Sequence, residues 1–203
     1  MKKITFLLVG AALALAACSK TETVNEQSVD AIGFNGAYIG NPTDSRAVTE
    51  LDDNSITSFQ VYGQYTKDAA AAVQVFDNVE VSNTTGSWTY TGGLRPWIEG
   101  AAYVFAGYAP SNVTAPAVNA GGYLSWANYD VSANQYDLIY ATQQATGQTY
   151  GNNQQVVFTF NHLLSIVGFT FKSGFDADTD LTISNVTVND VPSTATFTPD
   201  NTV

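Results

Sequence analysis

Cysteine is almost absent from this chain of 203 residues, in which Cys18 is the only one. A disulfide needs two thiols, so the fold must be held by packing rather than by an intrachain covalent link. Histidine also occurs only once, at position 162. Zinc sites normally use three or four nitrogen or sulfur ligands, and this composition cannot supply them. We therefore expect no metal site and no cofactor.

Charge is scarce and mostly of one sign. Charged residues make up 12% of the chain, and 7 Lys+Arg face 18 Asp+Glu, for a net charge of −11. Loss of Lys2 and Lys3 with a cleaved leader would leave 5 against 18, or −13. Such a field repels phosphate backbones, which argues against nucleic acid as a partner.

Sequence signatures of catalysis are also missing. The chain has no P-loop, no G-x-G-x-x-G after a strand and no G-x-S-x-G elbow. His162 lies inside an apolar segment, where we expect a half-buried side chain satisfied by a backbone carbonyl or a neighbouring strand. We expect no catalytic residues and no enzyme activity.

The N-terminus has the features of an export signal. Two lysines precede an apolar run from Ile4 to Ala14, and the tetrad Leu-Ala-Ala-Cys ends at Cys18. This arrangement resembles the bacterial lipoprotein signal, in which the cysteine thiol is acylated. We expect residues 1–18 to form this signal with its lipobox and acylated Cys18 to bind outer-membrane lipid, because several acyl chains hold a protein at a bilayer.

A polar stretch follows, and then a segment with a period of two. Residues 19–30 read as a flexible linker. Ile32, Phe34 and Tyr38 then recur on one face of an extended segment over residues 31–39, before Asn41-Pro42 interrupts it. We assign residues 19–46 to the linker and a first strand.

The rest of the chain also predicts strands. Runs rich in Val, Ile, Thr and aromatic residues alternate with turn residues, which is typical of an antiparallel all-β sandwich or barrel. A single turn of helix or a loop fits residues 68–72 equally well. The predicted strands are 56–65, 73–82, 87–91, 102–109, 122–126, 136–142, 155–160, 163–172, 181–188 and 194–198.

Two groups of side chains allow a ligand-binding interpretation beside a structural one. Asp176, Asp178 and Asp180 predict an acidic hairpin tip, and a weak calcium contact is the alternative; the spacing lacks the Gly and Glu of an EF-hand. The tryptophans predict core positions, with sugar stacking as the alternative. They are Trp88, Trp97 and Trp126.

Several segments together resemble the fimbrillin-like lipoproteins of Gram-negative anaerobes, subunits of the type V pilus and their relatives. They are SWTY at 87–90, PW at 96–97, YVFAGYAP at 103–110, YDLIYA at 136–141 and VFTFNHLLS at 157–165. The resemblance implies two transthyretin-like β-sandwich domains in tandem. We accordingly expect a first domain over residues 47–154 and an incomplete second domain over residues 155–203.

The resemblance also implies a route of assembly. Family precursors reach the surface as lipoproteins, a trypsin-like protease cuts after an arginine in an exposed loop, and the first strand is replaced by a strand of another subunit. Here the cut would fall between Arg46 and Ala47, and Ile32, Phe34 and Tyr38 would form the removable strand. Arg46 is the only basic residue between Lys20 and Lys67. The alternative is that Arg46 is a solvated loop residue and the strand stays in place.

Location and partners follow from the same resemblance. It implies an outer-membrane, cell-surface protein that is lipid-anchored and enters a fimbrium after processing, with other pilus subunits as partners. The sequence contains no obvious donor strand of its own. The competing hypothesis is a monomeric surface adhesin that uses exposed aromatic residues to bind a host protein or glycan.

Overall fold

In the computed structural model the described residues are 31–40, 55–133, 135–145, 155–165, 167–175, 180 and 182–198. Within these ranges the protein is all β, which confirms the expected class. No helix that could cross a membrane occurs in this part of the chain.

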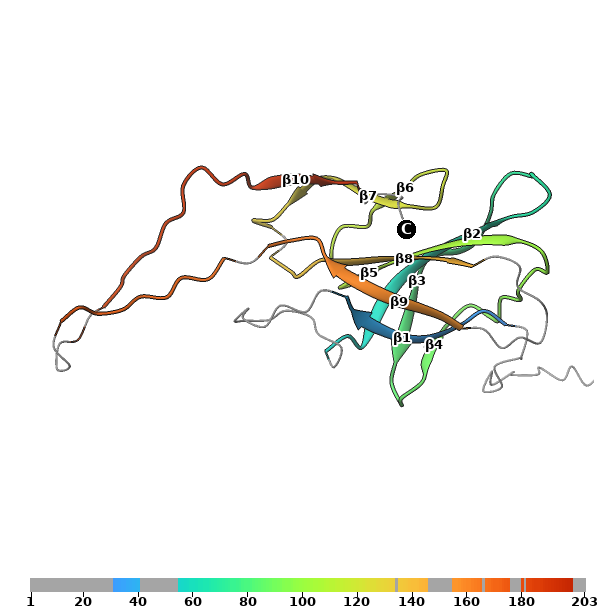
Figure 1. The fold of residues 1–203 in the computed structure, drawn as a ribbon, viewed down its shortest axis with the longest axis horizontal. Coiled ribbons are helices and arrows are strands. Elements are labelled where there is room, and N and C mark those ends of the chain that lie inside the picture. The colour runs from blue at the N-terminus through green and yellow to red at the C-terminus, as the bar shows by residue number, and fades with distance from the viewer. Residues whose placement is uncertain are drawn as a thin grey trace, which may run out of the picture.

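A seven-stranded sheet and a three-stranded sheet make up the fold (Figure 1). The large sheet has the order β1-β9-β8-β5-β2-β3-β4, and the small sheet has the order β10-β7-β6. The strands are β1 Gly33–Ile39, β2 Ser58–Thr66, β3 Val73–Asn83, β4 Trp88–Tyr90, β5 Ala102–Ala109, β6 Ala117–Val118, β7 Leu124–Asp130, β8 Ile139–Ala145, β9 Gln155–His162 and β10 Thr194–Phe197.

One strand pair departs from the expected antiparallel pattern. β1 runs parallel to β9, with Gly33 opposite Gln155 and Ile39 opposite Phe160, whereas the other pairs are antiparallel. Parallel neighbours need a long connection, and most of the chain separates these two strands. The sheet is therefore mixed, and its first strand in sequence lies at its edge.

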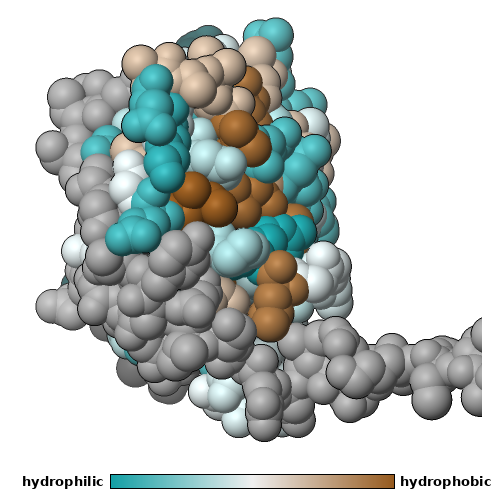
Figure 2. Space-filling model, turned by 90° about the vertical axis from the view of Figure 1, so that its right-hand side faces the viewer, coloured by the Kyte–Doolittle hydropathy of each residue, from teal (hydrophilic) through white to brown (hydrophobic). Residues whose placement is uncertain are grey.

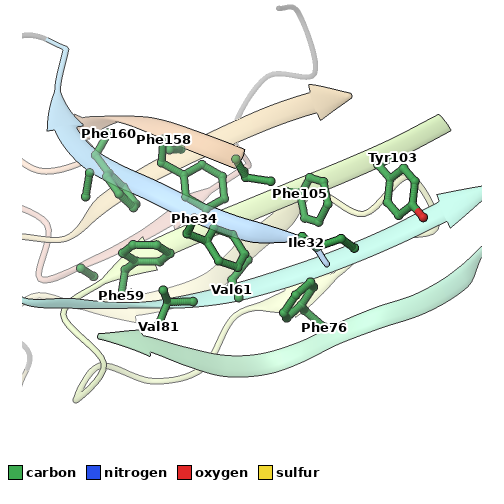
Figure 3. Close-up of a cluster of buried hydrophobic side chains, with 14 of the residues drawn as sticks. Ile32, Phe34, Phe59, Val61, Phe76, Val81, Tyr103, Phe105, Phe158 and Phe160 are labelled. Carbon is green, nitrogen blue, oxygen red and sulfur yellow. The ribbon is translucent and has the colours of Figure 1, made fainter. Parts of the chain in front are cut away.

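The large sheet buries side chains on both faces because its central strands alternate between two cores. In β2, Phe59 and Val61 enter the first core, while Tyr62 enters the second. The first core lies inside the curve of the large sheet and gathers Phe34, Phe59, Phe76, Phe105, Phe158 and Phe160 with smaller apolar residues (Figure 3).

The second core lies between the outer face of the large sheet and the small sheet. Tyr108 and Tyr140 from the large sheet meet Leu124 and Trp126 from β7. The Tyr108 ring stands edge-on to Trp126, with centroids 5.6 Å apart, and the Tyr108 hydroxyl donates to Asn78 Oδ1 at 2.9 Å. Together the two sheets form a sandwich whose larger layer curls toward a barrel.

The segment over residues 68–72 is a hairpin turn rather than a turn of helix. Asp68 and Ala69 both have positive φ, at 53° and 55°, and the Ala70 amide donates to the Lys67 carbonyl at 3.0 Å. Two positive φ values match a type I′ turn, which suits the twist of β2 and β3. Figure 2 views the end of the sandwich where this hairpin projects, and hydrophobic residues there reach the surface between hydrophilic ones.

The C-terminal part of the chain differs most from expectation. The described residues of the predicted strands 163–172 and 181–188 form no strand; residues 167–175 and 182–193 run out from the sandwich as an arm (Figure 1). Its apolar side chains are exposed, among them Phe169, Phe171 and Val188. A strand needs a paired neighbour, and the described part of the chain provides none for the arm.

The expected boundary near Gln155 divides the large sheet. β9 pairs with β8 on one side and β1 on the other, and Phe158 and Phe160 belong to the first core. β10 also returns to the sandwich, where it pairs with β7. β9 and β10 thus both pair with strands of the expected first domain.

Alkaline pH should destabilise the second core. Burial raises the pKa of Tyr108 and of Tyr140 from 10.0 to about 12. As pH rises through that interval, these tyrosines lose protons in the unfolded chain before the folded one, so the free energy of unfolding falls. We expect the double variant Tyr108→Phe, Tyr140→Phe to lose less unfolding free energy between pH 10 and pH 12, as measured by urea unfolding at each pH. Tyr136→Phe, at an exposed site, is the control, and an unchanged slope in the double variant would contradict the prediction.

Candidate functional site

β1 supplies the centre of the first core from the edge of the sheet. Ile32 and Phe34 are fully or almost fully buried, and Figure 3 shows both pointing into the cluster. The Phe34 ring lies 5.8 Å from that of Phe59, 5.5 Å from Phe76 and 6.1 Å from Phe158, measured between centroids. Since these rings come from three other strands, one side chain of β1 connects much of the core.

The N-terminal end of β1, with Ala31 and Ile32 directly before it, is also tied to the opposite edge of the sheet. The Ile32 amide donates to the Arg95 carbonyl at 2.7 Å, and the Tyr90 hydroxyl donates to the Ile32 carbonyl at 2.7 Å. Ala31 forms an isolated antiparallel bridge with Pro96. These contacts join β1 to β4 and the segment that follows it, so the large sheet closes on itself at this end.

Arg95 and Tyr90 reinforce each other at this junction. The Arg95 guanidinium lies 4.5 Å from the Phe76 ring centroid and 5.2 Å from that of Tyr90, within the range of cation–π attraction. Burial raises the pKa of Tyr90 above 10.0, although nearby Arg95 opposes the shift. The hydroxyl is therefore a stable donor to Ile32.

The C-terminal part of β1 is arranged differently because the strand contains a bulge. The register shifts between Phe34 and Ala37, so one extra residue lies on the β1 side, and Gly36 has a φ of +103°. After the bulge Ala37 points into the core, and Tyr38 is 49% exposed. The expectation that Tyr38 shares a buried face with Ile32 and Phe34 is wrong, because the bulge reverses the alternation.

A groove lies beside this half of β1, where the two edges of the sheet separate. It has a volume of about 370 Å³ and is lined by residues 36–38 of β1, residues 56 and 57, residues 83, 84 and 86 of the β3–β4 turn, and Trp88. None of these residues is charged. Its wall is fixed by the Asn83 amide, which donates to the Thr57 carbonyl at 2.9 Å, and by the Gly86 amide, which donates to Asn83 Oδ1 at 2.8 Å.

The remaining predicted residues fall in other places. Cys18, Arg46 and Ala47 lie outside the described residues. Trp97 and Trp126 are buried in the two cores, as expected, whereas Trp88 lines the groove and packs on Phe59. Asp176 and Asp178 also lie outside the described residues.

His162 was expected to be satisfied by a backbone carbonyl or a neighbouring strand, and it has a carboxylate partner in the segment before β8. Its Nδ1 lies 2.8 Å from Asp137 Oδ1, and the two side chains are 3% and 5% exposed. The Leu163 amide donates to the Leu138 carbonyl beside them. The pair fastens the end of β9 to the segment before β8, at the point where the arm departs.

Tyr90 and Arg95 had no place in the sequence prediction. Tyr90 ends the SWTY segment, but that segment gave no sign of a contact with Ile32, and Arg95 belongs to no motif; both contact Ile32 from more than 50 positions away. The bulge had a weaker signal in Gly36, because glycine within a strand pattern often marks a bulge. An added Cβ at Gly36 would lie 2.6 Å from Tyr38 Cε2, so this glycine also leaves room for the Tyr38 ring.

A family model described as fimbrillin-like matches residues 45–203. The chain belongs to the fimbrillin-like family. The match begins after β1, so the geometry of β1 is an observation on this chain itself. No curated protein and no solved structure matches the sequence.

Membership in the fimbrillin-like family favours a structural subunit of a cell-surface pilus over an enzyme, with other pilus subunits as partners. The all-β sandwich, with a large sheet that curls toward a barrel, fits that role.

In this fimbrillin-like chain, the contacts of β1 should be measurable as stability. Phe34→Ala is expected to lower the free energy of unfolding by about 3–5 kcal/mol, as for other buried phenylalanines. Tyr90→Phe removes one hydrogen bond and should cost about 0.5–1.5 kcal/mol. Urea unfolding measures both, with Val157→Ala, at an exposed site in β9, as the control. A Phe34→Ala loss no larger than the control would show that β1 is not part of the folded core.

Proposed function

We propose that this fimbrillin-like protein is a surface lipoprotein that serves as a fimbrial structural subunit or anchor and assembles by protease-triggered donor-strand exchange. The observation that carries the proposal is the position of β1: it is an edge strand, yet it places Ile32 and Phe34 at the centre of the first core. In this proposal acylated Cys18 holds the precursor at the outer membrane, and the cut after Arg46 frees β1.

The energetic cost of removing β1 supports its replacement by another strand rather than its loss without a substitute. Removal of a buried Phe or Leu-sized side chain costs about 2–5 kcal/mol, and a whole domain is stable by about 5–15 kcal/mol. A chain without Ile32 and Phe34 in place would therefore lose much of its stability. A strand from another subunit would restore both the apolar contacts and the main-chain hydrogen bonds along β9.

The direction of this contact also suits a filament. A strand given by one subunit and received by the next is a head-to-tail contact, and such contacts build open chains when the rotation does not close a ring. The position of Arg46 in the sequence supports the proposed cut: it lies between the end of β1 at Ile39 and the start of β2 at Ser58. A single cut there would disconnect β1 from the rest of the sandwich.

We further propose that the arm belongs to a second β domain. Exposed apolar residues recur at alternate positions, as at Val167, Phe169 and Phe171. Such a pattern is typical of a strand that buries one face.

The alternative is a monomeric adhesin. Trp88 and the exposed Tyr38 flank the uncharged groove, which is the observation that favours a neutral glycan ligand. A sugar-dependent change in tryptophan fluorescence, in surface protein that retains residues 19–46, would support this alternative.

Processing at Arg46 gives the first test of the proposed function. N-terminal sequencing of protein from sheared fimbriae should begin at Ala47, because the cut removes everything before it. Arg46→Gln should keep residues 19–46 and stay out of the fimbrial fraction. Lys67→Gln, at an exposed basic residue within the described part of the chain, is the matched control. Fimbrial protein that still begins upstream of residue 31 would contradict donor-strand exchange.

Lipid attachment gives an independent test. Cys18→Ser removes the acylated thiol, so the variant should lose palmitate labelling and leave the outer-membrane fraction. Ser19→Ala, at the adjacent residue, should leave both unchanged. Equal labelling of Cys18→Ser and the unaltered chain would rule out the lipoprotein assignment.

A further inference from the structure

β1 is held unequally along its length. Its N-terminal part is tied to the opposite sheet edge by the hydrogen bonds of Ile32 with Tyr90 and Arg95, and Phe34 lies among aromatic rings. After the bulge, β1 stays paired with β9, and the Gly40 amide donates to the Phe160 carbonyl at 2.7 Å. On its other side, residues 36–38 line the groove, and Tyr38 is half exposed. The side of β1 away from β9 is therefore closed at the N-terminal end and open at the C-terminal end, which leads toward Arg46.

The groove continues the slot that β1 occupies. Residues 36–38 form one wall, and Trp88 with the β3–β4 turn forms the other. Farther along the same gap, Tyr90 and Arg95 reach across to Ile32 and close it. The two edges of the large sheet are thus separated by one gap. This gap is open beside Tyr38, and hydrogen bonds close it beside Ile32.

The lining suits an extended peptide segment. It contains no charged residue, so an uncharged strand can enter without burying an unpaired charge. The two walls belong to strands at the edges of a sheet, which are the usual docking sites for an added strand. Ile56, a buried residue of the groove lining, offers an apolar contact to an entering side chain.

We propose that this groove is the entry site at which an extended, uncharged segment of a second fimbrillin-like subunit begins to displace β1. The inference rests on the proposed function and adds an order of events. The incoming segment binds beside Tyr38, takes over the C-terminal half of the slot, and advances toward Phe34 and Ile32 as β1 withdraws. The first core then stays filled throughout, because an apolar side chain of the incoming segment replaces each apolar side chain of β1 as it leaves.

Exchange kinetics can test this order without knowledge of the natural donor. The probe is a fluorescent synthetic peptide with the sequence of residues 31–40, added to full-length protein cut at Arg46 by trypsin. All variants carry Lys67→Gln and Lys172→Gln, which remove exposed competing sites. If the groove admits the peptide before β1 leaves, the exchange rate rises in proportion to peptide concentration.

Substitutions in the groove make the test specific. Thr57→Arg and Thr84→Arg place a long charged side chain in it, at exposed positions that should not affect folding. We expect each to slow exchange about tenfold, which corresponds to about 1.4 kcal/mol of lost contact. Thr89→Arg, at an exposed position of β4 outside the groove, is the matched control, and melting temperatures check the fold.

The possible outcomes separate the two proposals. An exchange rate independent of peptide concentration would mean that β1 leaves first, which overturns the entry site but keeps β1 replaceable. Equal slowing by Thr57→Arg and Thr89→Arg would also overturn the entry site. No exchange at any concentration would overturn replacement of β1, and the entry site with it. A peptide with Asp in place of Phe34 should not exchange in any case.

Discussion

The first core depends on the packing of the Phe34 ring against the aromatic rings around it. A strongly curved sheet leaves an apolar interior that its own strands cannot fill unless its two edges meet. β1 solves this problem by pairing with β9 along one side and reaching Tyr90 and Arg95 on the other. The strand is therefore peripheral in the hydrogen-bond order and central in packing, a combination that makes its removal costly.

The bulge at Gly36 gives the two halves of β1 different properties. A regular strand would bury Tyr38 beside Phe34 and bind evenly from end to end. Because one residue is inserted, Ala37 points into the core and Tyr38 points outward. The groove lies between this part of β1 and the β3–β4 turn. A single glycine with positive φ thus accompanies the difference between the two halves of the strand.

Periodicity predicted the strands of the large sheet well, because Phe59 and Val61, or Phe158 and Phe160, alternate with less apolar residues in a pattern that only a sheet fits. Periodicity failed for Tyr38, because the bulge shifts the alternation of buried and exposed residues by one position. It also failed for Phe169, because alternation shows which face of a strand could be buried but not whether a partner strand is present. The parallel pairing of β1 and the contacts of Tyr90 and Arg95 join residues far apart in sequence. Local patterns carry no information about such contacts.

The second core is independent of β1. It joins Tyr108, Leu124, Trp126 and Tyr140 between the two sheets, and β1 contributes no side chain to it. Strands β2, β5 and β8 therefore stay aligned by contacts on their outer face when the inner face is disturbed. Since β2 and β5 also form two walls of the first core, the slot would keep its shape while one strand replaces another. A sheet packed on one face only would lack this support.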